Sequence, residues 1–234
     1  IQKNGHASMY RAKDHNRDQS YFLFSTTQEQ LDYLRFPLGI IEKSETRTLA
    51  KKLNLNVADK PDSQDICFVP NGDYSSVIKK YRPESFNKGK IIDLLGNQIG
   101  EHDGIINFTI GQRKGIKISS DKPLYVVNIN SANNTVIVGS KENLEIKEIQ
   151  LRKLNLLASK KDFDKTINIK VRSTGRLLKA NVNFVSDYAK VEILDKETGI
   201  SPGQACVFYS KDTIGDKVLG GGWIDKSFNN KLST

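Results

Sequence analysis

Short strand-like runs, several of which alternate apolar and polar residues, fill the C-terminal half of the chain. They recur, separated by polar turns, at residues 136–138, 146–151, 167–171, 180–184, 190–194, 205–209 and 218–224. Alternation with a period of two is the pattern of a β-strand with one buried face, and short strands at this spacing are typical of a small barrel. The pattern therefore predicts a C-terminal β-barrel, with residues 141–234 as its domain.

The first third of the chain has a helical pattern. Thr26 and Glu29 have the spacing of a capping box. Leu31 then begins an apolar face, and Pro37 ends the helix. Further helices are expected over residues 44–53 and 73–81, with a loop over 56–65 between them.

The middle of the chain is divided by glycines. Six of them lie between Gly89 and Gly115, with strand-like runs at residues 105–110 and 125–129. We expect a small β-rich central domain over residues 71–140, preceded by the helical part over residues 1–70.

Composition favours an anionic partner. The chain has 36 basic and 27 acidic residues, a net charge of +9, which favours nucleic acid first. The alternative explanation of the net charge is a generally lysine-rich composition, because many lysines are scattered singly. No apolar run approaches the ~20 residues of a membrane span. We expect no membrane association and a cytoplasmic protein, and because Ile1 is not a start residue we expect a truncated N-terminus.

The two cysteines stand in different surroundings. Cys67 follows the polar run 62–65 after a loop, which suggests a thiol at the mouth of a site, although a buried structural thiol is an equal alternative. Cys206 lies in the apolar run 205–209, and we expect it in the core. The pair gives neither a disulfide framework nor a metal motif.

Three glycine-containing turns are candidates for binding. Gly111 and Gly115 bracket Gln112, Arg113 and Lys114, so backbone amides and two cations can meet a phosphate there, unless the segment is an ordinary solvated turn. Residues 201–204 have the composition of a tight turn. The run 220–222 lacks the context of a phosphate loop, and we expect a bulge or a close strand crossing.

Several segments together resemble one family. In order they read RDQSYFLF, FPLG, SETRTLAKKLNL, DSQDICF, TIGQRKGI, SPGQACVFY and LGGGWI. This order resembles the tRNA-specific 2-thiouridylases (the MnmA/TrmU family) over nearly the whole chain. The resemblance implies an α/β remnant, the tail of a PP-loop ATP pyrophosphatase domain, followed by a small β-rich central domain and a C-terminal β-barrel.

The resemblance also implies a reaction. The family replaces the C2 oxygen of the wobble uridine with sulfur in tRNAs for Lys, Glu and Gln. ATP, with Mg²⁺, adenylates the O2 position, and a cysteine persulfide, loaded by a cysteine desulfurase or a sulfur-relay protein, supplies sulfur. Cys67 matches the persulfide-carrying cysteine, which can end in a disulfide with a second cysteine.

Other roles carry over position by position. Gly5 matches part of the ATP site. The resemblance implies tRNA contacts at His6, Arg17, Asp18, Gln19, Arg172, Ser173 and Gln204. Arg17 keeps the charge of the family's Lys, whereas Ser173 replaces a Tyr and removes a stacking platform.

The chain departs from the family in two ways. The glycine-rich PP-loop motif and the segment with the partner cysteine are missing, and Cys206 is no substitute. We therefore expect this chain by itself to be inactive. A catalytically silent RNA-binding module is the alternative, and a redox or sulfur-carrier protein that uses Cys67 without RNA is a third possibility that the net charge disfavours.

Overall fold

A computed structural model describes residues 2–3, 5–60, 74–81 and 83–228. Among them, contacts join residues 5–60 to residues 146–228 in one compact unit and gather residues 74–145 into a second. Each unit has a hydrophobic core of its own. No helix in the described ranges is long and apolar enough to cross a bilayer.

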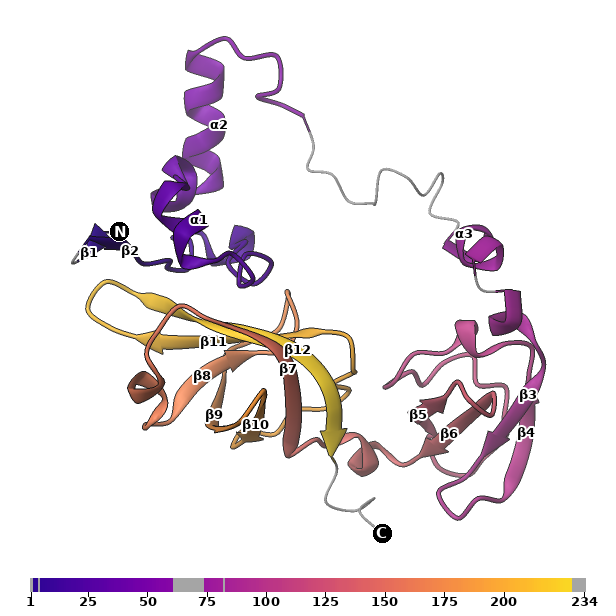
Figure 1. The fold of residues 1–234 in the computed structure, drawn as a ribbon. Coiled ribbons are helices and arrows are strands. Elements are labelled where there is room, and N and C mark those ends of the chain that lie inside the picture. Colours follow the sequence, from indigo (N-terminus) through magenta and orange to yellow (C-terminus); the bar gives the residue numbers. More distant parts are fainter. Residues whose placement is uncertain (1, 4, 61–73, 82, 229–234) are drawn as a thin grey trace. The chain divides into compact units, whose positions relative to one another are not determined.

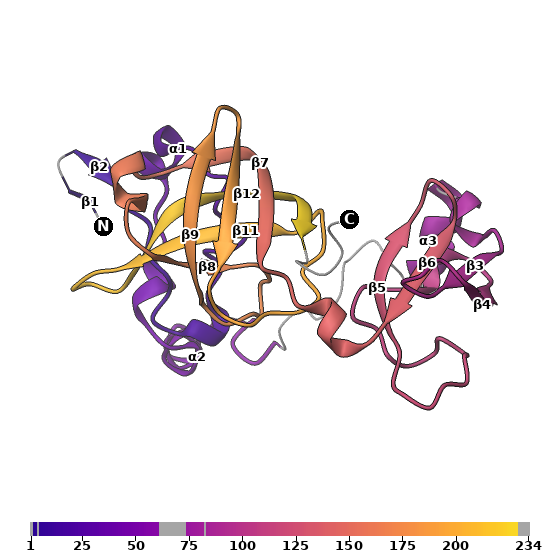
Figure 2. The ribbon, with the colours of Figure 1, turned by 90° about the horizontal axis from the view of Figure 1, so that it is seen from below.

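Six strands of the first unit close into an antiparallel barrel among the described residues (Figures 1 and 2). They are β7 (Glu148–Leu156), β8 (Ile167–Lys170), β9 (Leu178–Val185), β10 (Tyr188–Ile193), β11 (Ala205–Lys211) and β12 (Asp216–Phe228), arranged in the order β10-β7-β12-β11-β8-β9. Apolar side chains such as Ile149, Leu151 and Phe208 fill the interior and are fully buried. The predicted C-terminal barrel is confirmed, but the run 136–138, counted among its strands from the sequence, belongs to a separate four-stranded sheet.

The glycine run of β12 permits a close strand crossing, as predicted. A Cβ atom at Gly220 would lie 2.2 Å from the carbonyl oxygen of Asn155, and one at Gly221 would lie 2.6 Å from that of Cys206. The pairing of β12 with β7 also shifts register here. Any larger residue would therefore push these strands apart.

The N-terminal segment packs on the outside of the barrel. Its elements are β1 (Gln2–Lys3), β2 (His6–Ala7), η1 (His15–Arg17), α1 (Gln28–Tyr33), η2 (Pro37–Ile40) and α2 (Lys43–Lys52). Side chains alternate across β11, so Cys206 and Phe208 point inward while Val207 and Tyr209 point outward. The outward pair packs against the N-terminal residues Met9, Tyr21, Phe24 and Leu31.

The first helix begins one residue later than its sequence predicts. Thr27, not Thr26, is the N-cap: its hydroxyl accepts from the Gln30 amide at 3.2 Å, and the Gln30 side chain accepts from the Thr27 amide at 3.0 Å. The run TTQEQ offers both registers. Asn155 favours the later one, since its side chain donates to the carbonyl of Thr26 at 2.9 Å.

The second unit is a four-stranded sheet with short helices. Its elements are α3 (Tyr74–Tyr81), η4 (Pro83–Phe86), β3 (Gly89–Ile92), β4 (Gln98–His102), η5 (Ile105–Asn107), β5 (Tyr125–Asn130), β6 (Thr135–Gly139) and η6 (Lys141–Leu144). The strand order is β4-β3-β6-β5, and β3 and β6 run parallel.

The strand predicted over residues 105–110 is wrong. Gly104, with φ at +130°, turns the chain into a short 3-10 helix instead. Ile105 and Phe108 still pack against the core of the second unit. The apolar character of this run therefore reflects burial without strand pairing.

Candidate functional site

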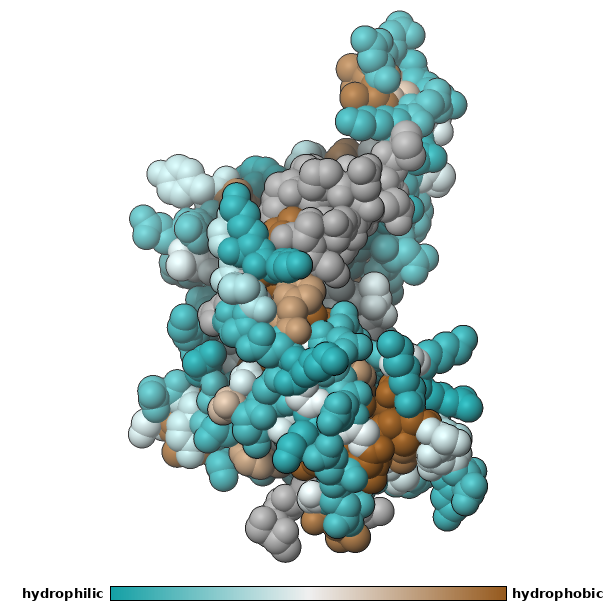
Figure 3. Space-filling model, turned by 90° about the vertical axis from the view of Figure 1, so that its right-hand side faces the viewer, coloured by the Kyte–Doolittle hydropathy of each residue, from teal (hydrophilic) through white to brown (hydrophobic). Residues whose placement is uncertain are grey.

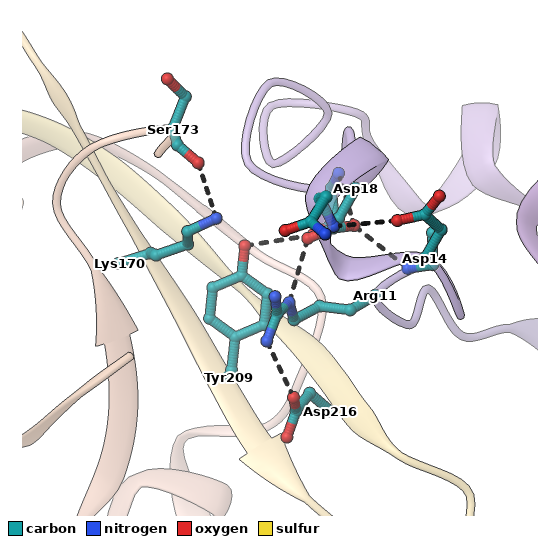
Figure 4. Close-up of polar contacts among 10 residues, drawn as sticks. Arg11, Asp14, Asp18, Lys170, Ser173, Tyr209 and Asp216 are labelled. Carbon is teal, nitrogen blue, oxygen red and sulfur yellow. Dashed lines mark hydrogen bonds and ion pairs between the residues drawn. The ribbon is translucent and has the colours of Figure 1, made fainter. Parts of the chain in front are cut away.

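Residues 11–20 form a loop that closes around the carboxylate of Asp18 (Figure 4). Its Oδ1 accepts from the backbone amides of Ala12 at 3.1 Å and Ser20 at 3.2 Å. Its Oδ2 accepts from Nε of Arg11 at 3.0 Å and from the Ser20 hydroxyl at 2.9 Å. Both oxygens are therefore used within the loop, and only 1% of the Asp18 side chain is exposed.

Hydrogen bonds tie this loop to the barrel. Because Ser20 gives its hydroxyl hydrogen to Asp18, Tyr209 of β11 is the donor in the 3.1 Å hydrogen bond between the two hydroxyls. Burial raises the pKa of Tyr209, which keeps it a donor. Arg11 also donates from Nη1 to Asp216 of β12 at 3.1 Å. We call Arg11, Asp18, Ser20, Lys170, Tyr209 and Asp216 the Asp18 cluster.

The Asp18 cluster determines what residues 17–19 present to solvent. Arg17 and Gln19 are exposed, whereas Asp18 between them is buried. The expected tRNA contact through the Asp18 side chain does not fit this burial, because its lone pairs already accept hydrogen bonds from the protein. The carboxylate instead fixes the backbone that carries Arg17 and Gln19.

Lys170 links the second predicted group, Arg172 and Ser173, to the Asp18 cluster (Figure 4). Its side chain is buried at the end of β8, and its ammonium donates to the Ser173 carbonyl at 2.7 Å. Burial lowers the pKa of Lys170, the Arg11 guanidinium lowers it further, and the Asp18 carboxylate opposes both. The turn after β8 therefore lies close to the loop of residues 11–20.

Arg172 is held in place but not buried. Its Nη2 donates to the Glu197 carboxylate at 3.1 Å and to the backbone carbonyl of Thr198. The side chain remains 42% exposed. A guanidinium fixed on one side and open on the other suits a contact with phosphate.

Gln204 lies in a turn that meets the same surface. Gly203, with φ at +85°, supplies the left-handed residue of the predicted tight turn. The amide of Ile224 donates to the Gln204 carbonyl at 2.8 Å, and the Gln204 side chain is exposed. The next carbonyl, of Ala205, accepts from the Tyr21 hydroxyl at 2.9 Å. The first residue of β11, directly after this turn, therefore contacts Tyr21.

His6 and Gly5 belong to a separate group of contacts around Asp32. The Asp32 carboxylate accepts from the Ala7 amide at 2.7 Å and lies 3.0 Å from Nδ1 of His6. The hydrogen bond from Ala7, followed by those from His6 and Gln28, lowers the pKa of Asp32 to about 2. The side chain of His6 is 72% exposed. Gly5 has φ at +82° and nothing within 4 Å of its missing Cβ.

The structure describes only one of the two cysteines, Cys206. Cys67, the predicted persulfide carrier, lies outside the described residues. Cys206 is fully buried as expected, and burial raises the pKa of its thiol. Within the described ranges, no group of three or more His, Cys, Asp or Glu residues is placed to hold a metal ion.

Sequence reasoning missed Arg11, Lys170 and Tyr209. Lys170 gave no signal of its burial, because in the alternating run 167–171 it takes a polar position between Ile169 and Val171. Arg11 stands only seven residues before Asp18, but no motif pairs the two. Tyr209 bonds to Ser20, which is 189 residues away in the sequence.

Three family models match successive parts of the chain. A model described as the tRNA methyl transferase HUP domain matches residues 1–71. One described as the tRNA methyl transferase PRC-barrel domain matches residues 75–140, and one described as the aminomethyltransferase beta-barrel domain matches residues 146–224. The HUP match agrees with the expected α/β remnant, and the third match coincides with the barrel.

Curated relatives with the name tRNA-specific 2-thiouridylase MnmA are similar along nearly the whole chain. The Dinoroseobacter shibae protein is 54% identical over 226 residues, which is 93% of this chain and 58% of the relative. The Rickettsia prowazekii protein is 49% identical over 226 residues, 95% of this chain and 62% of the relative. The Rickettsia massiliae protein is 52% identical over 223 residues, 94% of this chain and 60% of the relative. The chain thus spans about three fifths of these relatives.

Proposed function

The chain belongs to the tRNA-specific 2-thiouridylase family, and we propose that the protein containing it replaces the C2 oxygen of the wobble uridine of tRNA with sulfur. The observation that carries this proposal is that about half of the aligned residues are identical to those of the curated relatives, along nearly the whole chain. The substrates proposed are the tRNAs for Lys, Glu and Gln, and the compartment proposed is the cytoplasm.

The described residues support a tRNA-binding role for the first unit. Three predicted groups come from different chain segments of this unit: the exposed Arg17 and Gln19, the partly exposed Arg172 and Ser173, and the exposed Gln204. Arg17 and Arg172 offer a guanidinium, Gln19 and Gln204 an amide, and Ser173 a hydroxyl. Such a mixture suits recognition of a folded RNA by its backbone and shape. We propose that these residues contact tRNA directly and that Asp18 positions them.

We propose that His6 contacts tRNA and that Gly5 forms part of the ATP site. The exposed His6 ring, oriented by Asp32, is suited to an RNA contact. Gly5 offers an unobstructed backbone, as a close nucleotide contact requires. ATP, with Mg²⁺, supplies the activation that makes the uridine O2 a leaving group.

Cys67 is proposed to carry the transferred sulfur as a persulfide. A persulfide is a strong nucleophile near neutral pH, as thiolates of lowered pKa are. It would be loaded by a cysteine desulfurase or a sulfur-relay protein. Cys206 is unsuited to assist, because a fully buried thiol with a raised pKa reaches neither tRNA nor Cys67 as a thiolate. The second cysteine, and adenylation, are expected from sequence beyond this chain.

Binding of tRNA to the 234-residue chain tests the proposed role of the first unit. We expect the double variant Arg17→Ala/Gln204→Ala to bind an unmodified tRNA for Lys about tenfold more weakly than the parent chain, which corresponds to about 1.4 kcal/mol. Lys190→Ala removes one positive charge from an exposed position on β10 and serves as the matched control. Equal affinities of all three proteins would contradict these contacts, and no binding by any of them would favour a sulfur carrier that acts without RNA.

A further inference from the structure

A cavity of about 260 Å³ opens beside the glycine-flanked turn of the second unit. The residues that line it include three cationic ones, Arg113, Lys117 and Lys122, together with Ser120. No acidic residue is among the described residues that line it, although Asp121 is adjacent in the sequence. This volume far exceeds the ~10–15 Å³ that a cavity needs to hold one water molecule, so a hydrated phosphate group fits.

The three cations are available for a ligand. Arg113, Lys117 and Lys122 are exposed, and no ion pair or side-chain hydrogen bond joins any of them to a described residue. The surface of this unit is largely hydrophilic, with separate apolar patches (Figure 3). Three cations of one sign around one hollow repel one another, and a bound anion relieves that repulsion.

The backbone that carries these cations is fixed from within. The Gln112 side chain accepts from the Thr109 amide and donates to the Lys114 carbonyl, both at 2.9 Å. The Gln112 carbonyl accepts from the Val126 amide of β5 at 2.9 Å. Gln112 therefore closes the turn and attaches it to the sheet. The turn is already ordered before a ligand binds, so binding loses little further conformational entropy.

The floor of the cavity belongs to the core of the same unit. Ile116 is 5% exposed and packs with the buried residues of the sheet. Lys117, directly after it, has φ at +58°, a left-handed conformation that is unfavourable for a residue other than glycine. A strained residue at the wall of a charged cavity is a feature of binding sites.

We propose that this cavity, formed by residues 113–124, binds a phosphodiester group of the tRNA backbone. The inference rests on the proposed function, and it adds to the RNA-binding surface a site that lies wholly within the second unit. Arg113, Lys117 and Lys122 supply charge, and Gln112 acts as a positioning residue. A phosphate contact of this kind adds affinity that does not depend on the base sequence of the tRNA, and it weakens as the salt concentration rises.

The test compares tRNA binding by four forms of the 234-residue chain over a salt series. They are the parent chain, Arg113→Ala/Lys117→Ala/Lys122→Ala, the control Lys88→Ala/Lys90→Ala/Lys141→Ala and Gln112→Ala. The control removes the same charge from exposed positions elsewhere in the second unit. We expect the cavity variant to bind about tenfold more weakly than the control, with a slope of log affinity against log salt that is smaller by about 1. Gln112→Ala keeps the charge and is expected to lose about threefold with the slope unchanged.

The outcomes separate this inference from the proposed function. The mutated cations make no contact that holds the fold, so we expect unchanged melting temperatures. If the parent chain binds tRNA and the cavity variant matches its control, the phosphate site is refuted while the proposed function stands, and an acidic protein surface becomes the partner to test. If the parent chain does not bind tRNA, both the phosphate site and the proposed tRNA-binding role of the first unit are refuted.

Discussion

The ammonium of Lys170 donates a hydrogen bond to the backbone carbonyl of Ser173 at 2.7 Å. Lys170 is buried at the end of a barrel strand, and Ser173 lies in the exposed turn that follows. The barrel thereby holds the turn that carries Arg172. Since Lys170 also lies close to Asp18 and Arg11, one buried charge cluster supports two of the proposed tRNA-binding segments.

Replacing Lys170 with methionine should weaken tRNA binding while changing the stability of the fold little. Methionine keeps an apolar stem but removes the ammonium, whose burial is costly, so we expect the free energy of unfolding to change by less than about 1.5 kcal/mol. The turn at Ser173 loses its hydrogen bond, so we expect tRNA affinity to fall about threefold. Lys190→Met on β10 is the control. An affinity equal to that of the control would mean that the hydrogen bond to Ser173 does not position this turn.

Replacing Asp18 with asparagine should destabilise the first unit. The variant leaves Arg11 buried with Asp216 as its remaining carboxylate partner, and we expect a loss of about 3 kcal/mol. Asp225→Asn breaks an exposed ion pair with Arg152 and should cost less than about 1 kcal/mol. Urea unfolding monitored by the single tryptophan, Trp223 of β12, measures both. Similar losses in the two variants would show that the Asp18 pair behaves like a surface pair.

We expect low pH to break the hydrogen bond between Ala7 of β2 and Asp32 of α1. The folded pKa of Asp32 is about 2 against an ordinary value of 3.8. A lowered folded pKa stabilises the contact fully above about pH 4 and loses that contribution as the pH falls through about 2. We expect the protection factor of the Ala7 amide against hydrogen exchange to fall over this range, while that of the Ile169 amide in the barrel stays high. In Asp32→Ala, which removes the acceptor, the protection factor of the Ala7 amide should be low at every pH, and a high value in that variant would contradict the account.

Alkylation should distinguish the two cysteines. Burial raises the pKa of Cys206, so the folded chain holds it as an unreactive thiol. We expect iodoacetamide at mildly alkaline pH to modify Cys67 in the folded chain and both cysteines in guanidinium chloride. Peptide mapping by mass spectrometry reads the two sites separately. Modification of Cys206 in the folded chain would mean that the barrel opens easily.

The sequence predicted the barrel well because strand formation there follows a local pattern. Apolar and polar residues alternate in the run 180–184, where one face of the strand is buried, whereas the run 205–209 is apolar throughout because both faces of β11 are buried. The structure has strands at both places. Prediction was poorer where two local readings compete. Thr26 and Thr27 both satisfy a capping box, and the choice depends on Asn155, which is distant in sequence.

Site geometry was the least predictable part. Motif resemblance marked residues 17–19 as a set, but it cannot tell an exposed side chain from a buried one. The burial of Asp18 follows from Arg11 and from the packing of the loop against Tyr209 of β11. Charge counting likewise could not show that Arg113 shares a cavity with Lys117 and Lys122, since this depends on how residues 113–124 fold back on the sheet.

Sulfur transfer tests the central claim most directly. The measurement is the 2-thiouridine content at the wobble position of an unmodified tRNA for Lys, after incubation with ATP, Mg²⁺, a cysteine desulfurase and the native gene product that contains this chain. We predict thiolation by the native product, none by its Cys67→Ser variant, and nearly equal tRNA affinity of the two. Undiminished thiolation by Cys67→Ser would contradict the assignment of the persulfide. No thiolation by the native product, with tRNA binding intact, would leave a catalytically silent RNA-binding module as the better account.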